Sequence, residues 1–95
     1  MSDAPPLLAK YLALTEAALG AVHVGVPRAG FLAGASEDFL GMARSYLADA
    51  RHFLAAGDPE RALAAVSYAH GWIDAGVRLG LLDAGGDDQR FTPFR

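Results

Sequence analysis

Two aspartates and two histidines are the residues best suited to chemistry in this sequence. Asp49 precedes His52 by three positions, and His70 precedes Asp74 by four. On helices, each pair would therefore share one face. Carboxylate and imidazole groups bind metal ions, and they also act as general acids and bases. One hypothesis is thus a metal-binding or hydrolytic domain that uses Asp49, His70 and Asp74.

The turn between the two helices that carry these residues argues against this hypothesis. Gly57-Asp58-Pro59 combines a C′ glycine, an N-cap aspartate and an N1 proline, which together end one helix and start the next. So short a turn makes the two helices antiparallel neighbours. At roughly 1.5 Å per residue, Asp74 then lies about 12 Å along the axis from Asp49. Since the chain also has no cysteine, we predict no metal and no cofactor.

Asp49 has a different use at the edge of the apolar face of its helix, beside Tyr46. A carboxylate in such a position needs a hydrogen-bond partner. Ser67 or Tyr68 on the following helix lies at about the right level. We therefore predict that Tyr46, Asp49 and Ser67 form a structural polar seam between the two helices rather than a site.

Hydrophobic spacing predicts three helices, and hence an all-α, three-helix up-and-down bundle in a single domain, 1–95. The helices span about residues 5–23, 36–56 and 59–82, with a long linker at 24–35 and a C-terminal tail at 83–95. The second helix is expected to begin at Ser36, because serine is a favoured N-cap. Glu37 and Asp38 would then match the positive end of the helix dipole.

The third helix carries two apolar stripes. The first consists of Ala62, Val66, Ala69, Ile73 and Val77, and the second of Tyr68, Trp72 and Leu79. Two stripes on one helix need two packing partners. The second stripe is therefore a candidate interaction surface, covered either by the first helix or by self-association.

Three glycines interrupt this third helix, Gly71, Gly76 and Gly80. Each costs about 1 kcal/mol inside a helix relative to alanine. Their presence indicates close approach of another backbone, although Gly80 also suits the end of the helix.

Charge and composition exclude several classes of function. The net charge is −3 and no basic stripe is present to neutralise phosphates, so we expect no nucleic-acid partner. The first residues lack the positive region of a signal peptide. The apolar stretch from residue 7 to 26 is broken by charged and polar residues, so no membrane helix is expected. With no cysteine, the chain suits a reducing cytoplasm.

No nucleophile elbow, phosphate-binding glycine loop or informative Ser-His-Asp spacing is present. We therefore favour a module without catalytic activity over an enzyme. Its partner would be another protein or a second copy of itself.

Three runs of sequence resemble a small archaeal family catalogued as domain of unknown function 357. They are YLADARHF from residue 46, GD from residue 57 and ALAAVSYAHGWIDAGVRLG from residue 62. The resemblance covers about residues 31–82, and SYAHGWIDAGVRLG is its most specific part. It implies a three-helix up-and-down bundle. No established activity comes with the family, so it implies no functional residue.

Overall fold

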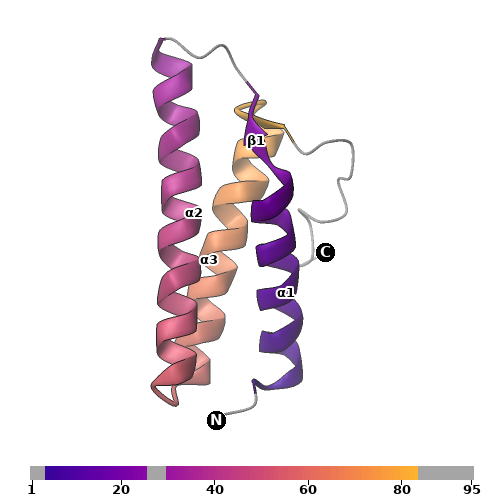
Figure 1. Cartoon of the computed structure of the whole chain (residues 1–95), viewed down its shortest axis with the longest axis vertical. Coiled ribbons are helices and arrows are strands. Elements are labelled where there is room, and N and C mark those ends of the chain that lie inside the picture. The colour runs from indigo at the N-terminus through magenta and orange to yellow at the C-terminus, as the bar shows by residue number, and fades with distance from the viewer. Residues whose placement is uncertain (1–3, 26–29, 84–95) are drawn as a thin grey trace.

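Three long helices and a two-stranded bridge make up the described residues, 4–25 and 30–83, of the computed structural model (Figure 1). In chain order the elements are α1 (Pro6–Ala21), β1 (His23–Val24), α2 (Phe31–Ala55), α3 (Pro59–Arg78) and β2 (Leu82–Asp83). The helices run up, down and up, and α3 lies behind α1 and α2 in Figure 1. The expected three-helix bundle is confirmed. The part of the predicted tail after residue 83 lies outside the described residues.

The turn between α2 and α3 has the predicted chemistry. Gly57 has a φ of 80°, and its N–H bonds to the carbonyl of Leu54 at 3.1 Å. The Asp58 N–H bonds to the carbonyl of Phe53 at 2.8 Å. This pair of bonds is the Schellman arrangement that closes a helix. The Asp58 carboxylate then accepts from the Arg61 N–H at 3.1 Å, which caps the start of α3.

The end of α3 repeats this arrangement. Gly80 has a φ of 77°, and its N–H bonds to the carbonyl of Val77 at 3.1 Å. The Leu81 N–H reaches the carbonyl of Gly76 at 2.9 Å. The helix therefore ends at Arg78, slightly before the predicted end, and Gly80 is the residue that stops it.

The start of α2 was predicted wrongly. The helix begins at Phe31, after Gly30 with a φ of 106°, so Ser36 lies inside it and is fully buried. The Ser36 hydroxyl is within donating distance of the Leu32 carbonyl, at 2.9 Å, and of the Leu81 carbonyl, at 3.0 Å. The serine thus joins α2 to the end of α3 and does not cap the helix.

The strand bridge closes the same end of the bundle. β1 and β2 are antiparallel, and His23 pairs with Asp83. The N–H of Gly25 donates to the Leu81 carbonyl at 2.9 Å. The Ser36 hydroxyl lies within donating distance of the same carbonyl. The segments before α2, inside α2 and after α3 therefore meet at one acceptor.

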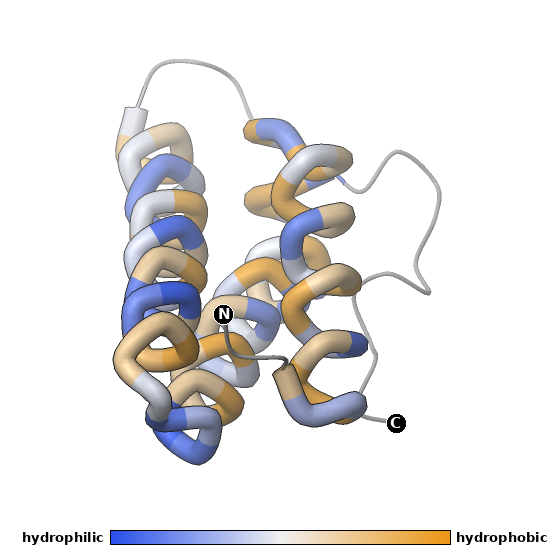
Figure 2. The backbone as a smooth tube through the Cα atoms, turned by 60° about the horizontal axis from the view of Figure 1, so that its bottom comes forward, coloured by the Kyte–Doolittle hydropathy of each residue, from blue (hydrophilic) through white to orange (hydrophobic). Residues whose placement is uncertain are grey.

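The core is built mainly from small side chains. Hydrophobic and hydrophilic positions alternate along each helix, as Figure 2 shows. The buried hydrophobic residues of the helices are Leu8, Ala18, Leu40, Ala43, Leu47, Ala50, Ala62, Ala65, Val66, Ala69 and Ile73. Gly76 is buried as well, and a Cβ added there would lie 2.6 Å from the Leu82 side chain. The close neighbour at Gly76 is therefore a side chain and not the backbone that was predicted, and a Cβ at Gly71 or Gly80 would meet nothing within 4 Å.

Candidate interaction surface

The structure does not bring Asp49, His70 and Asp74 together. Asp49 is exposed on α2, whereas His70 is only 1% exposed. Asp74 forms an ion pair with Arg78, with 3.0 Å between Oδ2 and Nε. Among residues 4–25 and 30–83, no group of three or more His, Cys, Asp or Glu side chains could hold a metal ion. These residues therefore offer no converging set of acids, bases or ligands.

His70 instead has a structural position between α3 and α1. Its Nδ1 lies 3.3 Å from the hydroxyl oxygen of Thr15, which is also fully buried. The ring tautomer decides which of the two groups donates the proton. His52, the fourth candidate, is exposed on α2, and its ring packs edge-on against Phe53 at 5.8 Å.

The members of the predicted polar seam make other contacts. The Ser67 hydroxyl donates to the carbonyl of Leu63 at 2.8 Å, one turn back in its own helix. Tyr46 stacks on Tyr68 with 5.3 Å between ring centroids. Because the Asp49 carboxylate is exposed, solvent can satisfy it without a protein partner. An aromatic contact therefore occupies the place expected for the seam.

An open groove of about 610 Å³ runs along α3. It is lined by Phe39, Ala64, Ser67, Tyr68, Gly71, Trp72 and Ala75. Two residues of the predicted interaction surface, Tyr68 and Trp72, are among them. Leu79, the third, lies one turn beyond Ala75 and is 67% exposed.

The aromatic walls of the groove are held by contacts between helices. Trp72 packs edge-on against Phe39 of α2, with 5.0 Å between centroids and an angle of 90°. Tyr68 is supported by Tyr46 of α2 but is still 62% exposed. Both walls are thus positioned before anything binds, while a large apolar surface faces outward.

The floor of the groove is made of small residues. A Cβ added at Gly71 would meet nothing within 4 Å, and Ala64 and Ala75 on either side carry only a methyl group. Hydrophobic spacing predicts the Tyr68 and Trp72 stripe. It cannot predict Phe39, because that residue reaches the groove only through the pairing of α2 with α3.

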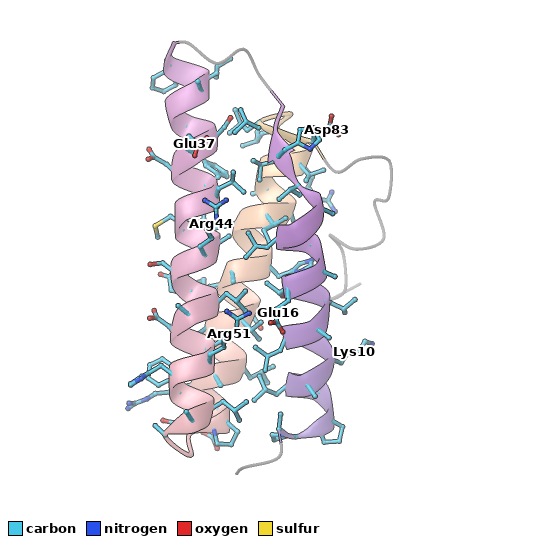
Figure 3. All side chains as sticks on the ribbon, viewed as in Figure 1. Lys10, Glu16, Glu37, Arg44, Arg51 and Asp83 are labelled. Atoms are coloured by element: carbon cyan, nitrogen blue, oxygen red, sulfur yellow. The ribbon has the colours of Figure 1, made fainter. Side chains whose placement is uncertain are left out.

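A second surface, which is charged, lies between α1 and α2. Figure 3 shows Glu37, Arg44 and Arg51 along α2, with Arg51 pointing toward Glu16 of α1. The carboxylate of Glu16 and the guanidinium of Arg51 form an exposed ion pair. The molecule therefore has a charged surface between α1 and α2 and an apolar groove on α3.

Comparison with known proteins gives a family match without an activity. A family model described as a protein of unknown function (DUF357) matches residues 10–82. No curated protein and no solved structure matches the sequence. The matched range contains every residue that lines the groove.

Proposed function

The chain belongs to the DUF357 family of unknown function, and we propose that it acts as a non-catalytic protein-interaction module. Its docking surface would be the groove along α3. The observation that supports this most strongly is Tyr68, which is 62% exposed and lines an open groove beside the half-buried Trp72. Tyrosine and tryptophan are enriched among the residues that carry most of the binding energy at protein interfaces.

The energetic reason is the apolar surface that the groove leaves in water. Covering apolar surface contributes roughly 25 cal/mol per Å². Tyr68 and Trp72 are already held against α2, so little side-chain entropy is lost when a partner packs on them. Neither α1 nor the strand bridge contributes a lining residue. A partner helix with small or apolar residues would suit this shape.

The competing function has weaker support. A metal-binding or hydrolytic domain would need Asp49, His70 and Asp74 to converge. Asp49 is exposed, His70 is buried and Asp74 is paired with Arg78. No observation among the described residues favours that alternative.

Site-specific photo-crosslinking tests the proposed docking surface. A benzophenone amino acid in place of Tyr68 should form a discrete protein adduct on irradiation in cells of the native host. The matched control carries the same amino acid in place of Ala13, an exposed residue of α1. We expect the adduct only with the probe at position 68, and mass spectrometry then identifies the partner.

Circular dichroism should first show that both labelled proteins keep the helical fold. Absence of an adduct from position 68, or the same adducts from both positions, would contradict the proposed function.

A further inference from the structure

We propose that the occupant of the groove is a second copy of this chain, with the two α3 helices packed antiparallel across a two-fold axis. This inference rests on the proposed function and names the partner of the same surface. A two-fold interface requires a surface that is complementary to itself. The order of residues along α3 meets this requirement in size and in charge.

The first support is the symmetric placement of large and small residues. In an antiparallel pair, residues equally far from the centre of the contact face each other. If the centre lies midway between Ala69 and His70, Ala64 faces Ala75 of the partner subunit. Tyr68 likewise faces Gly71 of the partner subunit. Each large side chain therefore meets a small one, and methyl groups meet methyl groups.

The space for this arrangement is present in each copy. Tyr68 is 62% exposed, and a Cβ at Gly71 would have nothing within 4 Å. A tyrosine ring from the second copy can therefore lie over the backbone at Gly71. Because helix separation depends on the side chains at the contact, small residues allow the two α3 helices to approach closely.

The second support is the charge at the two ends of α3, and it selects the antiparallel orientation. Glu60 and Arg78 are both exposed and lie about five turns apart, at 3.6 residues per turn, so they point the same way. At about 100° per residue, Gly71 lies within about 20° of the line that joins them. With the centre between Ala69 and His70, an antiparallel pair brings Glu60 to within one residue, about 1.5 Å along the axis, of Arg78 of the partner subunit, and the two-fold axis repeats this contact. A parallel pair would place like charges together.

The Arg78 guanidinium can serve both carboxylates. Its Nε lies 3.0 Å from Asp74 in the same helix. A guanidinium has five N–H donors in a planar fork, so one face can bond Asp74 while the outer nitrogens meet Glu60 of the partner subunit. The ion pair within α3 would hold the arginine in place for that contact.

The size of the contact predicts a weak, reversible dimer. A helix of 20 residues is about 30 Å long, and one helix pair lies at the small end of specific interfaces, below about 1,200 Å². We therefore expect association that depends strongly on concentration, with a dissociation constant in the micromolar range or weaker.

Sedimentation equilibrium from micromolar to millimolar concentrations tests this proposal on the full chain. The wild type should show a reversible monomer–dimer equilibrium. Gly71→Leu fills the space reserved for Tyr68 of the partner subunit, so it should weaken association by about tenfold or more. Gly41→Leu is the matched control, because Gly41 is an exposed glycine of α2 with equally open surroundings. It should leave association unchanged, and both variants should keep the helical fold.

The lack of native cysteine allows a direct test of orientation. Mixing Ala64→Cys with Ala75→Cys under mild oxidation should give a mixed disulfide dimer. Neither variant alone should cross-link, since like positions would lie about 16 Å apart along the axis. Disulfide dimers from each variant alone would overturn the antiparallel arrangement.

The two proposals fail in different ways. A monomer at millimolar concentration overturns self-association. If a probe at Tyr68 still captures a different protein, the groove remains a docking surface, and only the identity of the partner is overturned. A monomer without any adduct from that position overturns both.

Discussion

At the scale of single residues, the Ser36 hydroxyl shows how a local signal can be used for a distant contact. Serine is a favoured N-cap, yet here it lies inside α2 and reaches the Leu81 carbonyl 45 positions away. The Leu32 carbonyl is its other acceptor, one turn back. A single hydroxyl proton is therefore shared between the helix itself and the end of α3.

Replacing this serine should destabilise the fold. Ser36→Ala removes the hydroxyl from a fully buried position, and we expect the free energy of unfolding to fall by about 1 kcal/mol. The Leu81 carbonyl keeps the Gly25 N–H, which limits the loss. Ser45→Ala is the control, because Ser45 is exposed on the same helix. Urea denaturation measures both, and equal effects would contradict a special role for Ser36.

At the scale of elements, the sequence predicts a helix end correctly where the residues that fix that end lie within one turn of it. Gly57-Asp58-Pro59 was predictable because the positive φ, the cap and the proline all act within one turn. The start of α2 at Phe31 was not. Its first turns carry Gly34, which is typical of a linker, and the partner that retains Ser36 in the helix lies far away in sequence.

The interaction surface divides in the same way. The spacing of Tyr68 and Trp72 predicts an apolar stripe, and the groove contains both. The contribution of Phe39 depends on how α2 and α3 pair, and the small floor at Gly71 depends on what lies near it. His70 looks polar in sequence, yet Thr15 of α1 meets it in the interior. None of these contacts can be predicted from the sequence of one helix alone.

Two glycines of α3 should respond to alanine in opposite ways. At Gly76 a new Cβ would lie 2.6 Å from the buried Leu82 side chain, so Gly76→Ala should lower the free energy of unfolding by about 1–2 kcal/mol. At Gly71 the surroundings are open, so Gly71→Ala should raise it by up to about 1 kcal/mol through helix propensity. Thermal and urea unfolding of the two variants check the signs. A stabilised Gly76→Ala protein would contradict the close approach of Leu82.

At the scale of the whole molecule, α3 is the central helix, and α1 packs on it with fewer buried residues. Three residues of α1 are buried, Leu8, Thr15 and Ala18, against seven of α3. The exposed ion pair of Arg51 with Glu16 adds little, since surface pairs contribute about 0–1 kcal/mol. With α1 and α2 packed on two of its sides, α3 presents its remaining side as the groove. A second copy would enclose it.

The Leu81 carbonyl, which the Gly25 N–H and the Ser36 hydroxyl both approach, bears on how long the molecule stays folded. The turn at Gly57 closes a short loop, whereas this meeting point brings together segments before α2, inside α2 and after α3, at a greater loop-closure entropy. We infer that the meeting point forms after the barrier to folding. Ser36→Ala should then unfold faster while refolding at nearly the wild-type rate in stopped-flow measurements. Slower refolding would place the contact in the folding nucleus instead. In the expected case, the contacts at this one carbonyl set the unfolding rate, and hence the lifetime of the native state. The folding rate is then set by formation of the α2–α3 hairpin.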